Sequence, residues 1–150
     1  MRPTPAGWPR LSTAIYYDDA PKAIDWLCAA FGFEVRLKVE GDGGRIEHSE
    51  LTFGGAVVMV SQSGAKPGLP RMPRGASPAA LDGLNTQNVM LYVDDAEAHY
   101  RQALAAGARI VDEPRIHDYG EEYWADRSYG ALDLEGHVWW ITERVRDPQS

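Results

Sequence analysis

The chain has a single cysteine, no long apolar run and fewer basic than acidic side chains. One cysteine cannot form an internal disulfide, which is typical of reducing compartments, so we expect a cytoplasmic protein. Cys28 lies within an apolar helical pattern, where a buried, inert thiol is expected rather than a nucleophile. No stretch approaches the roughly 18 apolar residues of a membrane span. Residues 1–10 lack the apolar segment of a signal peptide and are expected to form a mobile arm.

The shortage of basic residues also bears on possible partners. The chain has 15 Lys and Arg against 22 Asp and Glu, which gives a formal net charge of −7. A nucleic-acid-binding surface needs a stripe of basic side chains to neutralise phosphates, so we expect no nucleic-acid partner. A neutral or cationic small ligand is compatible with this charge. The 150 residues, 44% of them hydrophobic, suffice for one domain or two small halves packed together.

Hydrophobic spacing in the first half predicts a strand, a helix and three strands. In residues 20–31, Ala23, Ile24, Leu27, Cys28 and Phe31 share one apolar face. Asp19 is a suitable N-cap for this helix, and Gly32 ends it. The strands are expected at 11–17, 33–39, 46–53 and 56–60.

The pattern restarts after a stretch rich in proline, glycine and serine. Residues 61–87 are expected to form a linker, with a short helical turn near 78–81. A polar and aromatic loop is expected over 114–127, with the start of another strand inside it as an alternative. A polar, frayed tail is expected from residue 144. The remaining elements are predicted as strands at 88–93, 108–111, 128–134 and 137–142, and a helix at 96–106.

Three blocks of the first half recur in the same order in the second half. The sequence IYYDDA at 15–20 returns as LYVDDA 76 residues later, and LCAAFG at 27–32 resembles LAAG at 104–107. FGGAVVMV at 53–60 matches LEGHVWWI 81 residues later. Ordered recurrence of this kind predicts two copies of one βαβββ unit. In each copy the helix would cover one face of a four-stranded sheet, and the other face would curl around a shared cavity.

This paired βαβββ pattern resembles the vicinal oxygen chelate superfamily, which includes glyoxalases, bleomycin-resistance proteins and extradiol dioxygenases. Each half opens with a strand, Asp-Asp and a helix ending in Gly, and closes with a Gly turn and an apolar strand. The closing stretch is similar to that of the uncharacterised glyoxalase and bleomycin-resistance-like branch. It contains Tyr119-Gly120, Asp126-Arg127 and the run DLEGHVW at 133–139.

The resemblance covers residues 11–143 and implies an α+β fold. Two βαβββ modules would form a curved eight-stranded mixed sheet around a cleft, and members of the family commonly pair as homodimers. The implied divisions are an N-terminal arm (1–10), module one (11–60), a linker (61–87), module two (88–143) and a tail (144–150).

Metal-dependent members of this family carry His, Gln or Glu ligands in the first and last strands of each module. The matching positions in this chain hold Ser12, Met59, Asn88 and Trp140. None of these suits a hard divalent cation, and among their neighbours only Gln87 is a usual ligand. The resemblance therefore favours the metal-free binding members and no cofactor. A divalent metal at a displaced site is the alternative.

Strand alternation selects the side chains expected to face the cleft. Aromatic members of this set would stack on a planar or cationic ligand, or else fill a core without a ligand. Arg127 would meet a ligand carboxylate or pair with an acidic residue of its loop. The predicted ligand-binding residues are Tyr16, Met59, Asn88, Tyr92, Trp124, Arg127 and Trp140.

The four histidines differ in their expected roles. His48 and Glu50, two residues apart on one strand, are candidates for an acid/base pair or half of a displaced metal site. The simpler interpretation is a hydrogen-bonded polar pair. His137 is expected to be structural, and His99 and His117 are expected to face solvent.

Together these features predict a small-molecule-binding protein of the drug-sequestering kind, with an aromatic or cationic ligand in a metal-free cleft. The alternative is a metal-dependent lyase or dioxygenase of the glyoxalase type that uses His48 and Glu50. A third possibility is a structural or regulatory dimer without a ligand.

Overall fold

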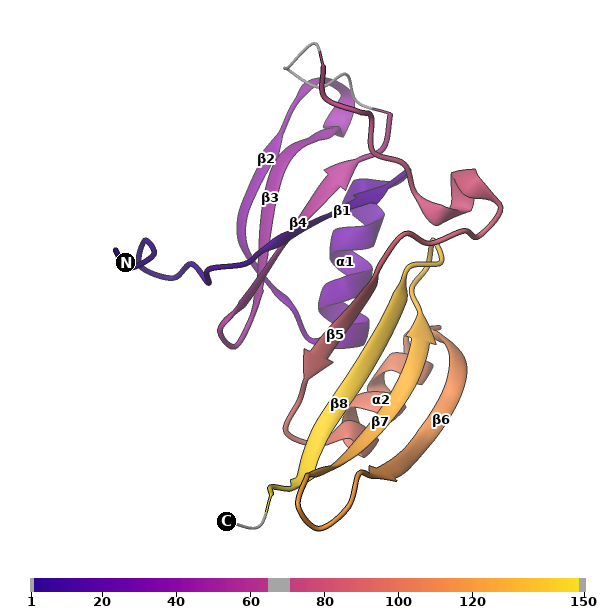
Figure 1. Cartoon of the computed structure of the whole chain (residues 1–150). Coiled ribbons are helices and arrows are strands. Elements are labelled where there is room, and N and C mark those ends of the chain that lie inside the picture. Colours follow the sequence, from indigo (N-terminus) through magenta and orange to yellow (C-terminus); the bar gives the residue numbers. More distant parts are fainter. Residues whose placement is uncertain (1, 65–70, 149–150) are drawn as a thin grey trace. The chain divides into compact units, whose positions relative to one another are not determined.

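A computed structural model describes residues 2–64 and 71–148 (Figure 1). Residues 65–70 of the predicted linker and the last two residues of the predicted tail lie outside the described residues. The chain divides into two compact units, Met1–Gly83 and Leu84–Ser150. The division falls within the predicted linker. Among the described residues, no helix is long and apolar enough to cross a membrane.

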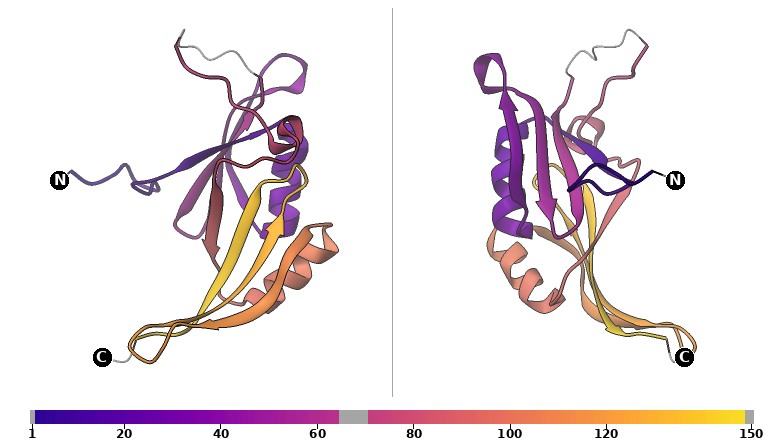
Figure 2. Two further views of the ribbon diagram at one scale, coloured as in Figure 1. Left: turned by 45° about the vertical axis from the view of Figure 1, so that its right-hand side comes forward. Right: turned by 90° about the vertical axis from the view of Figure 1, so that its left-hand side faces the viewer.

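The first unit is a four-stranded sheet with one helix against it (Figure 2). The strands lie in the order β1-β4-β3-β2, with β1 parallel to β4 and the other pairs antiparallel. The elements are β1 (Thr13–Tyr17), α1 (Ala20–Phe31), β2 (Glu34–Glu40), β3 (Ile46–Phe53) and β4 (Ala56–Gln62). Two 3₁₀ turns, η1 (Asp42–Gly44) and η2 (Pro78–Leu81), complete the unit.

The second unit repeats this arrangement. Its strand order is β5-β8-β7-β6, again with one parallel pair, β5 and β8, and two antiparallel pairs. The elements are β5 (Asn88–Tyr92), α2 (Ala96–Ala105), β6 (Arg109–Asp118), β7 (Ala125–Leu132) and β8 (Val138–Arg146). The prediction of two βαβββ modules in an α+β fold is therefore confirmed. The eight predicted strands form two four-stranded sheets, one in each unit.

The predicted helix signals correspond to the observed caps. The Asp19 side chain accepts a hydrogen bond from the Lys22 N–H and begins α1, while Gly32 adopts φ = 75° at its end. Asp95 caps α2 in the same way by accepting from the Ala98 N–H. Both helices bury an apolar face against their own sheet, where the largest fully buried side chains include Trp139, Tyr17, Tyr129 and Phe31.

Two predictions about the second unit are wrong in their bounds. The loop predicted at 114–127 is shorter, because β6 continues to Asp118, and the strand that was allowed to start within this stretch, β7, begins at Ala125. Pro114 is tolerated because β6 is an edge strand with register shifts between Ile110 and Arg115.

The tail is also more ordered than predicted. Strand β8 continues to Arg146 instead of fraying from residue 144. Arg144 pairs with Asp126 at 2.6 Å, and Arg146 pairs with Asp118, also at 2.6 Å. These two ion pairs attach the end of β8 to β7 and to the end of β6.

Candidate ligand-binding site

The face of the second sheet opposite α2 carries most of the predicted aromatic residues. In Figure 1, α2 lies behind β7 and β8, so this open face is turned toward the viewer. Side chains alternate along the strands, and Trp139 and Ile141 are fully buried on the helix side. Met90 and Tyr92 on β5 are 60% and 45% exposed, and Trp140 on β8 is half-buried between two buried neighbours. The alternation predicted for β5 and β8 is therefore observed.

Trp140 lies opposite a glycine of the neighbouring strand β7. It is the register partner of Gly130 on β7 and of Met90 on β5. A Cβ added to Gly130 would lie 3.2 Å from Cζ3 of Trp140 and 3.1 Å from Cγ2 of Val111. Those distances are tighter than most Cβ contacts, so a side chain at 130 would require the Trp140 ring and Val111 to shift by a few tenths of an ångström. Glycine at this position lets the indole edge lie close to the β7 backbone.

A polar cluster lies further along the same face. Nε of Arg144 donates to Oδ1 of Asp126 at 2.6 Å, and Nη2 donates to the Tyr92 hydroxyl at 3.0 Å. The guanidinium carbon lies 5.2 Å from the centroid of the Trp124 ring and 5.7 Å from that of Tyr92, within cation–π range. Tyr92 and Trp124, which were predicted as ligand-binding residues, thus meet around an arginine that was not predicted.

The buried carboxylate of Asp126 orients the Arg144 guanidinium through a hydrogen bond. This hydrogen bond is the main cause that raises the pKa of the guanidinium. A charge-assisted bond from a buried carboxylate holds the guanidinium in one orientation. The Arg144 cluster is defined as Arg144, Asp126, Tyr92 and Trp124.

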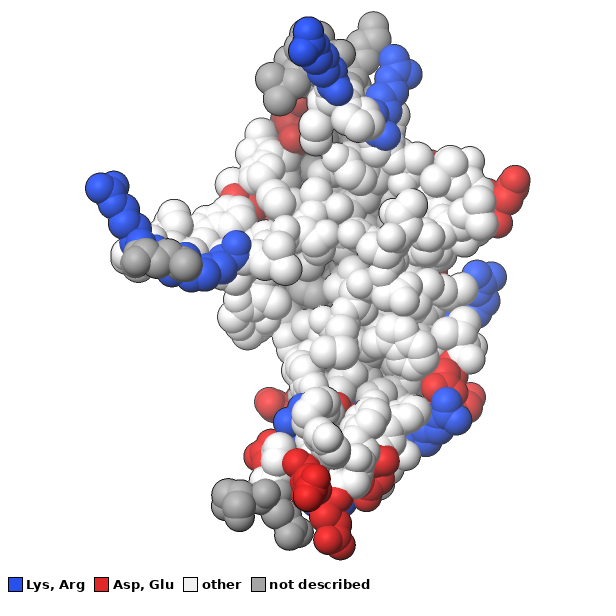
Figure 3. Space-filling view, in the orientation of Figure 1, with Lys and Arg blue, Asp and Glu red and all other residues white. Residues whose placement is uncertain are grey.

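Charges also gather at the end of the second unit where β6 and β7 meet. Figure 3 shows acidic side chains at this end and few charges over β5 and β8. Here Arg146 donates to both carboxylate oxygens of Asp118, at 2.8 and 2.6 Å, and to the Gly120 carbonyl. The Arg146 hydrogen bond, followed by that of the Gly120 N–H, lowers the pKa of Asp118 to about 2.

The structure does not bring every predicted residue to this face. Arg127 lies on the helix side of β7, because its neighbours Asp126 and Ser128 point to the open face. There it pairs with Glu143 at 3.2 Å, and Glu143 also accepts from the Ala96 N–H at the start of α2. Asn88 lies on the open face at the beginning of β5 and is exposed. Of the seven predicted residues, four lie on the open face of the second sheet: Asn88, Tyr92, Trp124 and Trp140.

The other two predicted ligand-binding residues belong to the first unit. Tyr16 and Met59 are half-buried on β1 and β4, on the side of the sheet away from α1. The backbone at Gly75 covers the Tyr16 ring so closely that a Cβ there would collide with it. The linker therefore occupies the surface of Tyr16 that a ligand would need.

His48 and Glu50 form a hydrogen-bonded pair in the first unit, as the simpler interpretation expects. Nε2 of His48 lies 3.0 Å from Oε1 of Glu50, and Nε of Arg36 lies 2.8 Å from Oε2. The His48 hydrogen bond is the largest cause that lowers the pKa of Glu50, and Arg36 adds to it. Both carboxylate oxygens are engaged, which makes Glu50 a weak candidate for a general base.

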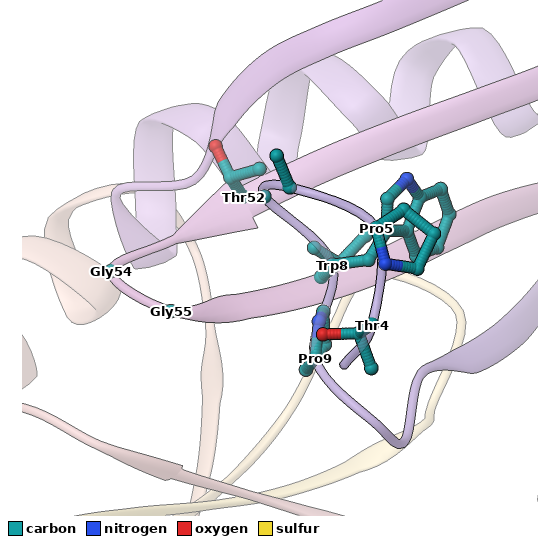
Figure 4. A pocket seen from close by; sticks show the side chains of 10 residues that line it. Thr4, Pro5, Trp8, Pro9, Thr52, Gly54 and Gly55 are labelled. Atoms are coloured by element: carbon teal, nitrogen blue, oxygen red, sulfur yellow. The ribbon is translucent and has the colours of Figure 1, made fainter. Parts of the chain in front are cut away.

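The N-terminal arm packs beside this pair. The Trp8 N–H donates to the Pro5 carbonyl, and Gly7 between them has φ = 75°, which defines a tight turn. The Arg36 guanidinium stacks on the Trp8 ring at 4.5 Å and donates to the Gly7 carbonyl. An open pocket of about 420 Å³ lies between the arm and the β3–β4 hairpin (Figure 4). Residues 4–9 line it from the arm, and Thr52, Gly54, Gly55 and Val57 line it from the hairpin.

The residues at the family's metal positions do not fit a divalent cation. Ser12, Met59, Asn88 and Trp140 offer a hydroxyl, a thioether, an amide and an indole, whereas such cations favour carboxylate and imidazole ligands. Within residues 2–64 and 71–148, no group of three or more His, Cys, Asp or Glu side chains could hold a metal ion.

Two polar residues of the second unit have structural roles. His99 is buried, not solvent-facing as predicted, and its Nδ1 lies 2.6 Å from the Tyr129 hydroxyl. Asp133 accepts hydrogen bonds from the N–H groups of Glu135 and His137 and from the Trp139 indole. The spacing of Ala96, His99 and Ala103 along α2 is the signal that would have placed His99 on the buried face.

Comparison with known proteins agrees with this architecture. The family model of the glyoxalase, bleomycin-resistance protein and dioxygenase superfamily matches residues 11–141. The chain belongs to this superfamily.

The chain also has relatives among uncharacterised proteins. Such proteins of Mycobacterium bovis and Mycobacterium tuberculosis are each 32% identical over 141 residues, which is 93% of this chain. The match covers 86% of the M. bovis protein and 76% of the M. tuberculosis protein.

Solved structures resemble the chain as well. TioX from Micromonospora sp. ML1 is 31% identical, with a TM-score of 0.71 over 91% of this chain and 99% of TioX. The lactoylglutathione lyase of Agrobacterium tumefaciens shares the fold at 19% identity, with a TM-score of 0.60 over 95% of this chain and 96% of the lyase.

Proposed function

We propose that this superfamily member is a metal-free small-molecule-binding protein that takes an aromatic ligand on the open face of its second sheet. The observation that carries the proposal is the position of Trp140, whose indole rests on Gly130 in place of a metal-binding carboxylate. A ring that is restricted by contact with a neighbouring strand has little freedom to lose when a second ring stacks on it.

The surroundings of Trp140 support a ligand rather than a filled core. Met90 beside it is 60% exposed, and Tyr92, one step along β5 on the same face, is 45% exposed. Large apolar side chains that gather at the surface mark sites for ligands or partners. Methionine adapts its shape to different aromatic partners, which suits a protein that sequesters drug-like molecules.

We also propose that the protein acts in the cytoplasm as a homodimer. The single cysteine and the dimers common in the family support this assignment.

Loss of the Trp140 ring tests the binding proposal. We expect W140A to weaken binding of planar dyes, such as cationic proflavine and neutral N-phenyl-1-naphthylamine, about tenfold, which is about 1.4 kcal/mol. Fluorescence titration or calorimetry measures this loss. The matched control is W26A, which removes a half-buried tryptophan from α1 in the first unit. If no planar compound binds, or if W140A and W26A behave alike, Trp140 is not the stacking surface.

A further inference from the structure

We propose that Arg144 binds the acidic group of an elongated aromatic ligand whose rings lie on Trp140. This inference rests on the proposed function and adds the chemical class of the ligand, an aromatic carboxylate or sulfonate. Arg144 follows Trp140 by four residues on β8, so both side chains lie on the open face.

The guanidinium is held in place by contacts below it. Asp126 is only 6% exposed and accepts the Nε–H at 2.6 Å, while Tyr92 receives a hydrogen bond from Nη2 at 3.0 Å. The Tyr92 and Trp124 rings flank the guanidinium within 5.7 Å. A cation fixed in this way is pre-organised to receive an anion.

The third contact of Arg144 differs from the first two. Nη1 lies 3.2 Å from Oδ1 of Asp147, whose side chain is 81% exposed near the end of the described chain. An exposed ion pair of this kind contributes roughly 0–1 kcal/mol, so an incoming anion readily displaces it. A ligand carboxylate that binds Nη1 takes the place of the Asp147 carboxylate, which then turns toward solvent and competes with the ligand for the same edge of Arg144. The Nη1 edge is therefore the part of the cluster that a ligand can reach.

Two neighbouring arginines, Arg146 and Arg127, are less suited to binding an anionic group of a ligand. Arg146 already makes a two-pronged contact with Asp118 and a bond to the Gly120 carbonyl. Arg127 lies on the helix side and pairs with Glu143. Among these three arginines, Arg144 combines a place on the open face with an exchangeable partner.

The separation of the two ends defines the length of the ligand. Four residues of a strand span about 13 Å, which is the distance from the Trp140 backbone to that of Arg144. A single benzoate is too short to reach both ends. Two or three rings in a line, with the acidic group at one end, match the span.

A pair of dyes that differ only in the acidic group tests the inference. The probes are 6-(p-toluidino)naphthalene-2-sulfonate and its parent without the sulfonate, N-(p-tolyl)-2-naphthylamine, titrated by fluorescence at constant ionic strength. We expect R144Q to weaken binding of the sulfonate about tenfold and to leave the parent within twofold. We expect D147N, a change at an exposed side chain, to strengthen binding of the sulfonate severalfold. The control R115Q removes an exposed arginine from β6 and should change neither affinity.

The outcomes separate this inference from the proposed function. If neither dye binds, or if W140A leaves both affinities unchanged, the proposed function fails and the inference fails with it. If both dyes bind through Trp140 but R144Q affects them equally or not at all, the binding proposal survives and the role of Arg144 is overturned. D147N decides the matter if R144Q does not fold, because an unchanged affinity for the sulfonate in D147N also overturns the role of Arg144.

Discussion

At the scale of single residues, His99 shows how a polar side chain can be part of a core. Its imidazole is 9% exposed and lies 2.6 Å from the hydroxyl of Tyr129, which is fully buried. Burial raises the pKa of Tyr129, so the phenol stays protonated. The His99 ring nitrogen and the Tyr129 hydroxyl hydrogen-bond to each other, as polar groups buried in a protein core commonly do. The hydrogen bond between the two side chains contributes to the stability of the fold. The pair lies on the helix side of the second sheet and has no part in the proposed binding site.

Removal of the Tyr129 hydroxyl leaves the ring nitrogen of His99 buried without this partner. We expect Y129F to lower the free energy of unfolding by about 1–3 kcal/mol, the usual cost of an unsatisfied buried polar group. Urea denaturation followed by circular dichroism measures the change. The same substitution at Tyr123, a loop residue that is 54% exposed, should cost less than about 0.5 kcal/mol. Equal losses for the two variants would show that the bond to His99 contributes nothing.

At the scale of elements, the turn between β7 and β8 is organised by one carboxylate. Asp133 is 5% exposed and accepts from the backbone N–H groups of Glu135 and His137 and from the indole N–H of Trp139. Gly136 completes the turn with φ = 94°. The DLEGHVW motif is therefore a structural device that sets the start of β8 and, through it, the position of Trp140.

Substitution of Asp133 should loosen this turn. We expect D133N to destabilise the protein by about 3 kcal/mol, because an amide accepts these hydrogen bonds more weakly and brings its own donors into a buried site. Thermal and urea unfolding measure the loss. D94N, at an exposed aspartate after β5, is the matched control and should stay within about 0.5 kcal/mol. A D133N protein as stable as D94N would contradict this role.

The ends of elements were harder to predict than their order. Helix α1 and strand β3 were predicted with their observed bounds, because apolar spacing and glycine ends are local signals. Strand β8 extends to Arg146 because of partners on other strands, Asp126 and Asp118. Those pairings depend on strand register, which polar residues at a strand end do not reveal.

At the scale of the whole molecule, the internal repeat predicted the fold, while the site depended on details that differ between the copies. Trp140 was found by its place in the repeat. Arg144 was missed because the tail was expected to fray, and Arg127 was selected instead although it points to the other face of β7. Coverage of Tyr16 by Gly75 is a contact across 59 residues, which strand alternation cannot predict.

Metal content tests the alternative function for the molecule as a whole. We expect protein purified without chelators to contain well under one equivalent of Zn, Ni, Mn or Fe, because side chains at the four family positions are poor ligands. Elemental analysis measures the content, and treatment with EDTA should leave the melting temperature unchanged. One bound equivalent that H48A or E50A removes would instead favour the lyase or dioxygenase, with the metal at a displaced site.

The contact between Gly130 and Trp140 couples the residues that can stand at the two positions. Continuing the register of β3 and β4 by one residue places Glu50 opposite Met59 in the first unit, where the second unit has Gly130 opposite Trp140. A side chain at 130 would require the Trp140 ring and Val111 to shift by a few tenths of an ångström. Sequences that carry a side chain at 130 are therefore expected to hold the ring at 140 slightly further from the strand, or to carry a smaller residue there.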